Sequence, residues 1–322
     1  MKPHGRLQRY LLQGLLGVGR VGLVLEAMHE ADGSPFVLHV PYLRYQERLG
    51  FGPRYLSGAL WAATSQLQGF CVPVHCDCAG ELVFSARPRL DGAPLQALLR
   101  RMRARRARLS RQVILSIALP LARALQRLHD TRPQSLPAPA CHGRLTPSRV
   151  MLCSDGTLSI LGLPAPAGWL DGAWLSPMES SRLCELPPEQ LEGFPLTPAG
   201  DVYLLSLLIY TMWTLHNPHE QRTPRETLQS VFDSPPRLQD SMRMGPALRR
   251  VLEEGLSARP EQRPTMAQLI HTLSAVLRED GGAVSRADLA ALKQQWIPST
   301  TQPPASMLHT SDAEMLMSLL HS

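Results

Sequence analysis

Three glycines stand close together near the start of the chain, in the segment Gly17-Val18-Gly19-Arg20-Val21-Gly22-Leu23-Val24. Apolar segments lie on both sides of it, from Tyr10 to Leu16 and from Gly22 to Met28, and such segments are typical of β-strands. In a dinucleotide-binding fold this glycine spacing opens a helix. Here it opens a strand. The sequence therefore predicts a strand, a glycine loop and a second strand, with a third strand at Phe36 to Val40.

A second pattern is the segment His142-Gly143-Arg144-Leu145-Thr146-Pro147-Ser148-Arg149-Val150-Met151-Leu152. It resembles the catalytic loop of protein kinases, where an aspartate serves as the base and an asparagine binds a metal ion before an apolar run. His142, Leu145 and Pro147 match that loop. Arg144 stands where the family has the aspartate, and Arg149 stands where it has the asparagine.

Other segments that resemble kinase motifs follow in the family's order, over about residues 10 to 278. They include a helix predicted from Ser110 to His129, then Pro187-Pro188-Glu189, Asp201 to Leu207, and Ala258 to Thr265. The resemblance implies a two-lobed α+β fold. We expect a small antiparallel-sheet N-lobe over residues 1–92, a larger and mainly helical C-lobe over 93–280, and a linker with an amphipathic C-terminal helix over 281–322.

The resemblance places His39 where kinases carry a lysine on the third strand. The histidine is too short to copy the ammonium arm. No neighbouring strand can supply a lysine instead, because Lys2 and Lys293 are the only lysines in the chain. The helix expected near residues 53–68 also lacks a carboxylate that would hold such a lysine.

The positions for the base and for the metal ligands are substituted as well. Arg144 cannot accept a proton, and the positive charge of Arg149 would repel a metal ion. The segment at the position of the family's metal-binding aspartate begins with Gly162, which has no side chain. On these grounds the sequence predicts no catalytic residues, no bound metal and no enzyme activity.

The glycine loop leaves two interpretations open, a nucleotide site that works without magnesium and an inherited hairpin with no ligand. A residual nucleotide pocket would be lined by Gly17, Gly19, Gly22, Val24, Val37 and Met151. Val37 stands where the resemblance would place a small alanine, so its extra methyl groups would narrow the pocket. The expected cofactor is therefore none, with ATP bound without magnesium as the alternative.

The residues that would hold the C-lobe together are present. The resemblance implies that Glu189 pairs with Arg263 and that Asp201 accepts hydrogen bonds from the backbone of the catalytic loop. A kinase fold that is retained while its catalytic residues are substituted indicates a pseudokinase, which would act as a scaffold or allosteric regulator. The first alternative is an ATP-binding kinase with weak transfer to serine, threonine or tyrosine. The second alternative is an anion- or RNA-binding module.

That second alternative rests on an arginine run from Arg100 to Arg111, whose seven arginines contribute more positive charge than the whole formal net charge of +6. The run can equally be a solvated helix face. No aromatic residue lies among the arginines to stack on bases, so nucleic acid is not the expected partner. Cys71, His75, Cys76 and Cys78 could form a metal cluster, but their spacing lacks the two-residue spacer of zinc sites.

The C-terminal segment predicts a helix that binds a protein partner or its own lobe. Ser311-Asp312-Ala313-Glu314 has the form of a capping box, and the next apolar side chains share one helix face: Met315, Leu316, Leu319 and Leu320. The apolar segment Leu204 to Trp213 is too short to span a bilayer, and the first residues lack a signal-peptide core. We expect no membrane partner and a cytoplasmic location, with the nucleus as the alternative.

Overall fold

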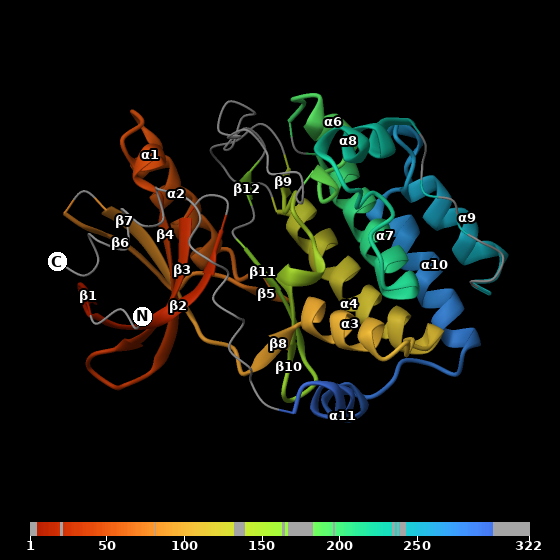
Figure 1. Ribbon diagram of the computed structural model, residues 1–322, viewed down its shortest axis with the longest axis horizontal. Coiled ribbons are helices and arrows are strands. Elements are labelled where there is room, and N and C mark those ends of the chain that lie inside the picture. Colours follow the sequence, from red (N-terminus) through yellow and green to blue (C-terminus); the bar gives the residue numbers. More distant parts are fainter. Residues whose placement is uncertain are drawn as a thin grey trace. The chain divides into compact units, whose positions relative to one another are not determined.

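The computed structural model describes residues 5–19, 22–80, 82–131, 139–162, 165–166, 183–195, 197–233, 236, 238 and 243–298. The described residues form two compact units, whose elements are labelled in Figure 1. The first unit runs up to Gln66 and includes Cys71–Asp91. The second unit comprises Leu67–Phe70 and Gly92–Ser299.

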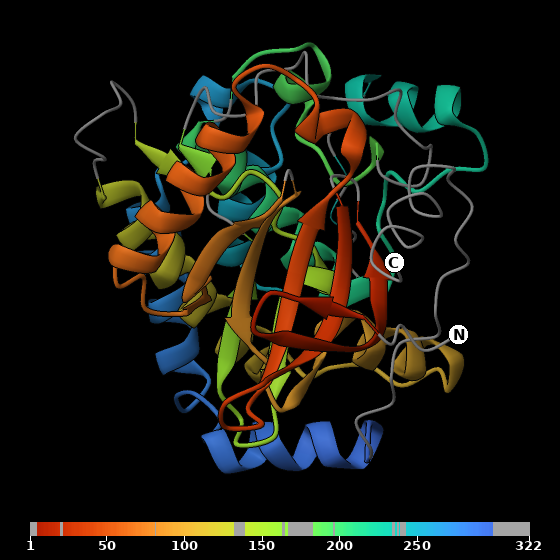
Figure 2. The ribbon, with the colours of Figure 1, turned by 90° about the vertical axis from the view of Figure 1, so that its left-hand side faces the viewer.

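An antiparallel sheet dominates the first unit, and its strands lie side by side in Figure 2. The order across the sheet is β1-β2-β3-β4-β7-β6. The strands are β1 (Arg6–Leu7), β2 (Tyr10–Val18), β3 (Gly22–His29), β4 (Pro35–Pro41), β6 (His75–Ala79) and β7 (Leu82–Pro88). Side chains alternate between the two faces of a strand. Leu23, Leu25 and Ala27 of β3 are accordingly all fully buried.

Two helices follow β4, namely α1 (Leu43–Gln46) and α2 (Phe51–Thr64). The helix expected near residues 53–68 is α2, which begins and ends slightly earlier than expected. Gly50 starts it with φ 78°, a left-handed conformation that favours glycine. The hydroxyl of Ser65 donates to Trp61 O at the other end. The buried side of α2 packs against β6 and β7.

The second unit contains short strands and a set of helices. One sheet has the order β5-β11-β10-β8, and β9 pairs with β12 in a separate ladder. The strands are β5 (Phe70–Cys71), β8 (Gly92–Pro94), β9 (Ala140–Cys141), β10 (Val150–Cys153), β11 (Leu158–Leu161) and β12 (Ala165–Pro166). The catalytic-loop segment therefore lies between β9 and β10, with the 3-10 turn η1 (Pro147–Arg149) at its end.

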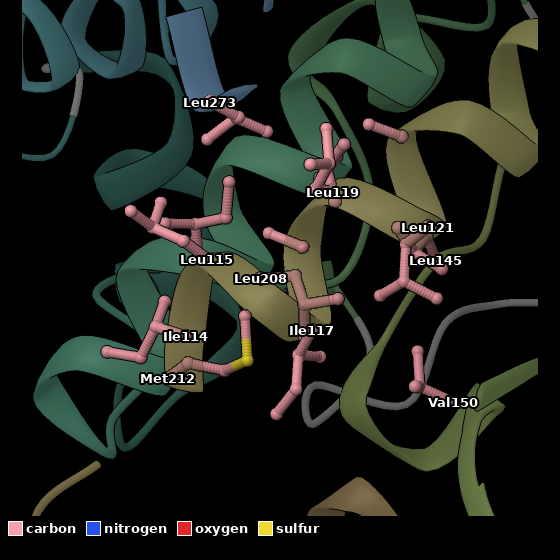
Figure 3. Packing of buried hydrophobic residues seen from close by; sticks show 14 of the residues in the cluster. Ile114, Leu115, Ile117, Leu119, Leu121, Leu145, Val150, Leu208, Met212 and Leu273 are labelled. Carbon is pink, nitrogen blue, oxygen red and sulfur yellow. The ribbon is translucent and has the colours of Figure 1, made fainter. Parts of the chain in front are cut away.

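The helices of the second unit enclose a large apolar core. They are α3 (Leu95–Ala104), α4 (Arg111–Asp130), α6 (Pro188–Leu191), α7 (Pro198–Thr214), α8 (Pro224–Asp233), α9 (Pro246–Gly255), α10 (Met266–Glu279) and α11 (Arg286–Trp296), with a 3-10 turn η4 (Pro260–Gln262). Side chains of α4 meet those of α7 and α10 in this core (Figure 3). Ser110 caps α4 by accepting a hydrogen bond from Val113 N, so the helix begins where its pattern predicts.

The architecture confirms the predicted fold class, with an antiparallel-sheet lobe and a mainly helical lobe of the α+β type. Helix α7 is apolar on nearly all sides, and each residue from Gly200 to Ile209 is buried. Such a helix belongs to the middle of a large core. Among the described residues, no helix combines the length and the apolar character that crossing a membrane requires.

Candidate active site

The glycine loop connects β2 to β3, and its described ends are hydrogen-bonded to each other. Gly19 N donates to Gly22 O at 2.8 Å, and the buried hydroxyl of Tyr42 donates to Gly19 O at 2.7 Å. A Cβ on Gly22 would overlap the carbonyl of Val40, whereas a Cβ on Gly17 would meet no atom within 4 Å. Close packing of β3 on β4 therefore explains why residue 22 is a glycine. It gives no reason for a glycine at position 17.

The remaining residues of the expected nucleotide pocket are divided between the two units. Val24 on β3 pairs with Gly17 on one side and with His39 on the other. Val37 on β4 is buried, and both valines belong to the first unit. Met151 on β10 is also buried and belongs to the second unit.

His39 is hydrogen-bonded to α2 through a tyrosine. The Tyr55 hydroxyl lies 2.9 Å from His39 Nδ1, 3.2 Å from His39 O and 2.7 Å from Ser85 Oγ. A phenol has one hydrogen to donate, so Tyr55 accepts in the other bonds. Burial raises the pKa of Tyr55 above its ordinary value, which keeps the phenol neutral. A hydrogen-bonded network thus connects α2 to β4 and β7, where the family has a lysine and a glutamate.

Sequence reasoning missed Tyr55 because it looked for a carboxylate in this helix. One signal was available. Tyr55 stands four residues after Phe51 and four before Ala59, and both of these are buried. Residues at this spacing share one face of a helix. A buried tyrosine hydroxyl on that face needs a hydrogen-bond partner, and the neighbouring third strand can supply one.

Asp201 holds the backbone of the catalytic loop. Its Oδ1 accepts from Gly143 N at 2.6 Å, and its Oδ2 accepts from His142 N at 2.8 Å. His129 Nε2 lies 2.9 Å from the same Oδ2. Complete burial would raise the pKa of Asp201, but the hydrogen bonds and charge of these partners outweigh burial and hold the pKa below its usual range. The ionised carboxylate therefore fixes the start of the loop.

The imidazole of His142 is buried and neutral. Its Nε2 donates to Leu161 O at 3.1 Å, and its Nδ1 accepts from Arg144 N at 3.4 Å. Burial lowers the pKa of His142 to about 4, and the nearby charges of Arg149 and Arg144 lower it further against the opposing effect of Asp201. The imidazole thus links the catalytic loop to the end of β11 without adding a charge.

Arg149 and Gly162 lie against each other at the two positions where kinases bind a metal ion. A Cβ on residue 162 would fall 2.5 Å from Arg149 Nη1 and 3.3 Å from His142 Nε2. Gly162 also has φ 115°, which favours glycine. Magnesium prefers oxygen ligands. These two residues offer a guanidinium and no side chain, so they do not fit a magnesium ion.

Glu189 and Arg263 form a two-pronged ion pair in the second unit. Arg263 Nη1 and Nη2 donate to the two carboxylate oxygens of Glu189 at 2.7 and 2.8 Å. The guanidinium also donates to three backbone carbonyls and lies over the ring of Tyr203, 4.9 Å from its centroid. The Arg263 side chain is completely buried, so the pair connects α6 to the segment before α10.

Three members of the arginine run contact other helices. Arg101 Nη1 donates to Trp296 O at 2.6 Å, and Arg105 lies over the Trp296 ring at 5.7 Å. Arg111 donates two hydrogen bonds to the carboxylate of Asp280. These contacts attach α11 and the end of α10 to α3 and α4. They favour a structural role for this part of the run.

The cysteines near β6 have separate partners. His75 Nδ1 lies 2.7 Å from the Tyr10 hydroxyl, while the Cys76 thiol lies 3.9 Å from Leu56 O. Among the described residues, the one group of three possible metal ligands within reach of each other is His129, Cys141 and Asp201. Its carboxylate already accepts the hydrogen bonds that hold the catalytic loop. Met315, Leu316, Leu319 and Leu320 lie outside the described residues.

Comparison with known families identifies a match in the second unit and the residues just before it. Residues 90–273 match the model of the family described as protein tyrosine and serine/threonine kinase, which is more than half of the chain. The matched part contains the catalytic loop, Gly162, Glu189, Asp201 and Arg263.

Comparison with curated proteins gives a relative of the same kind. The chain is 25% identical over 278 residues to the probable serine/threonine-protein kinase PkwA of Thermomonospora curvata. The alignment covers 84% of this chain and 34% of that protein. The chain thus spans about a third of the length of the curated relative it matches.

These two findings contradict the prediction that the protein is not an enzyme, because both the family and the relative are described as kinases. The prediction rested on the substituted positions His39, Arg144, Arg149 and Gly162, and on the lack of a carboxylate in the helix expected near residues 53–68. Phosphoryl transfer depends mainly on positioning and charge, and enzymes stripped of single catalytic groups keep part of their rate enhancement. The absence of the family's catalytic side chains at these positions was therefore too narrow a basis for the prediction. From its matched region and its two-lobed fold, the chain belongs to the protein tyrosine and serine/threonine kinase family.

Proposed function

We propose that this chain is an ATP-binding protein kinase domain that transfers phosphoryl groups slowly to serine or threonine hydroxyls. The observation that carries the proposal is the network at Asp201, which fixes the backbone of His142 and Gly143. Because phosphoryl transfer depends mainly on positioning, a catalytic loop held in this way supports transfer even where its side chains differ. The name of the relative supports serine or threonine as the acceptor.

The reaction joins the acceptor oxygen to the γ-phosphorus of ATP and breaks the bond from that phosphorus to the β-γ bridging oxygen. ADP leaves with the electrons of that bond. The hydroxyl proton needs an acceptor, and the guanidinium of Arg144 cannot serve. The proton passes instead to an oxygen of the transferred phosphoryl group. A positioned base contributes roughly 10²–10⁴-fold in rate, so transfer is expected to be slower by about that factor than with a carboxylate at position 144.

The test measures transfer of labelled γ-phosphate to serine and threonine peptides by the wild type and by Arg144→Asp. The variant places a carboxylate at the base position, so its rate is expected to rise by roughly 10²–10⁴-fold. Arg225→Met, a charge change at an exposed position on α8, serves as the control and is expected to leave the rate unchanged. A contaminating kinase would not respond to Arg144→Asp. Absence of transfer by both wild type and variant would refute the proposal.

A second proposed role is binding of a protein partner, as a scaffold or allosteric regulator. The support is the sequence of the C-terminal segment, whose capping box precedes Met315, Leu316, Leu319 and Leu320. A short apolar helix beyond a linker must bury its face against its own lobe or against a partner. Affinity capture with and without residues 305–322 tests this role. A partner that binds equally well to both forms would exclude the segment as the binding site.

A further inference from the structure

A cavity lies on the second unit between α4, β11 and the segment before β5. Its volume is about 260 Å³. It is lined by Gly69, Pro120, Leu121, Arg123, Arg127 and Leu158. All of these residues belong to the second unit, and none belongs to the glycine loop or to the catalytic loop. The cavity is therefore built from residues other than those of the candidate active site.

Backbone contacts hold the walls of this cavity together. Gly69 has φ 90°, which favours glycine, and a Cβ there would fall 2.8 Å from the Cβ of Ala124 on α4. Glycine therefore lets this segment pack directly on the helix. On the other side, Ile160 N of β11 donates to Gly69 O at 2.8 Å. The elements around the cavity are thus attached to each other, and the cavity is preformed in the folded chain.

Two arginines of α4 bring positive charge to the cavity. Pro120, Arg123 and Arg127 follow each other at intervals of three and four residues, and residues at these intervals share one face of a helix. All three are exposed, so the cavity opens to solvent. Arg127 Nη2 donates to the backbone O of Gln68 at 3.3 Å. A guanidinium has five N–H groups, so this bond orients Arg127 and leaves other donors for a ligand.

No carboxylate in the described part of the chain forms an ion pair with Arg123 or Arg127. The one carboxylate on α4 is Asp130, which accepts from Gln126 Nε2 at 2.8 Å and does not line the cavity. Beside the two guanidinium groups stands the apolar side chain of Leu121. The cavity thus combines two positive charges with an apolar wall.

From this combination we propose that the cavity binds a phosphorylated serine or threonine side chain of a protein partner. A phosphate monoester has three acceptor oxygens and a charge of about −1.5 to −2 at pH 7, which suits two guanidinium groups. A carboxylate would balance only one of them. This site is independent of the proposed function, because none of its residues takes part in phosphoryl transfer by the chain itself.

The size of the cavity favours a side chain over a whole small molecule. Pockets for small molecules usually have volumes of roughly 300–1,000 Å³ and enclose most of the ligand. This cavity is smaller, at about 260 Å³, and three of its lining residues are exposed. It therefore suits one side chain that a larger partner presents, with the neighbouring residues of the partner lying outside on the protein surface.

The first test measures retention of peptide libraries on the immobilised full chain, without added nucleotide. Each library has random residues around one fixed central residue, which is phosphoserine, phosphothreonine, glutamate or serine. We expect the phosphorylated libraries to be retained at least tenfold more than the glutamate and serine libraries. Equal retention of the phosphorylated and serine libraries would overturn the inference. Equal retention of the phosphorylated and glutamate libraries would overturn the assignment of a phosphate group.

Variants test whether the cavity is the binding site. Arg123→Met and Arg127→Met each remove one positive charge, so retention of phosphorylated peptides is expected to fall about tenfold or more. Arg225→Met removes the charge of an exposed arginine on α8 and is expected to change nothing. Unchanged retention by either cavity variant would overturn the inference.

Circular dichroism checks that the cavity variants are folded. Where one is not, the lysine variant at the same position decides, because it keeps the charge without the two-pronged geometry. Weaker retention by the lysine variant would support the site, and unchanged retention would refute it.

Glycerol 3-phosphate distinguishes a protein partner from a small phosphorylated molecule. One peptide sequenced from the retained library is labelled, and unlabelled peptide or glycerol 3-phosphate displaces it. The peptide is expected to bind at least tenfold more tightly, because its flanking residues also contact the protein. Equal affinity of the two competitors would overturn the assignment to a protein side chain.

Discussion

At the scale of single residues, two buried histidines should make the protein sensitive to acid. Burial lowers the pKa of both His142 and His219 to about 4, and His219 Nε2 lies 2.9 Å from the Tyr203 hydroxyl. The ordinary pKa of histidine in an unfolded chain is about 6.5. Between these values the unfolded chain binds more protons than the folded chain. The stability contribution is therefore complete above about pH 6.5 and is lost as the pH falls towards 4.

The expected slope is about 1.4 kcal/mol per pH unit for each proton taken up on unfolding. Urea unfolding at several pH values from 6.5 to 5 measures it. His219→Gln removes one of the two titrating groups, so its free energy of unfolding should fall less steeply with acid than that of the wild type. The same slope in variant and wild type would show that His219 is not protected from protonation.

The buried pair of Glu189 and Arg263 gives a second prediction at this scale. Glu189→Gln leaves a completely buried guanidinium without its carboxylate, so the free energy of unfolding is expected to drop by about 3–5 kcal/mol. The exposed pair of Arg250 and Glu254, 2.9 Å apart, is the control. Glu254→Gln should cost less than about 1 kcal/mol. Similar losses from both variants, measured by urea unfolding, would contradict the importance of burial.

At the scale of elements, the attachment of α2 depends on the Tyr55 hydroxyl. Tyr55→Phe removes the partner of His39 Nδ1 and Ser85 Oγ, so it is expected to cost about 1–3 kcal/mol and to speed amide exchange in α2. Tyr45→Phe is a matched control. The Tyr45 hydroxyl is buried, and no hydrogen-bond partner for it occurs among the described residues. Its removal should be neutral or stabilising. Equal effects of the two variants would exclude the hydrogen-bond network as the cause.

At the scale of the whole molecule, the apolar core around α7 should be the most stable region of the second unit. Nearly every residue of α7 between Gly200 and Met212 is buried, whereas Thr227 and Val231 are the buried residues of α8. Amides that exchange only on global unfolding belong to such core helices. Hydrogen exchange followed by mass spectrometry should therefore show slow exchange in α7 and fast exchange in α8. Comparable rates in the two helices would contradict this.

Much of the fold could be predicted from the sequence, because the signals are local. The apolar spacing and Ser110 predicted a helix from Ser110 to His129, and the structure has α4 at Arg111–Asp130. The strands beside the glycine loop followed from short apolar segments in the same way. The order of the motifs then indicated the α+β class. The prediction that the protein is not an enzyme was wrong, because it inferred the activity of a whole domain from a few substituted positions.

The candidate site could be predicted only in part. Its residues could be named one by one, since the resemblance assigns a position to each. The contact between Tyr55 and His39 joins residues on a helix and a strand, and that between Arg149 and Gly162 joins two chain segments. Neither contact leaves a repeating pattern in the sequence. The sequence favoured a vacant metal site, whereas the structure has a guanidinium against Gly162.

The sequence by itself determined which side chains stand at the motif positions, among them His39, Arg144, Arg149 and Gly162. It also determined the elements that carry them, because helix and strand periodicity depend on near neighbours. Only the tertiary structure decided the surroundings of these side chains, namely the buried, neutral imidazole of His142 and the guanidinium packed at Gly162. Burial and charge arise when distant segments pack together, so the chemical state of the site follows from the folded chain.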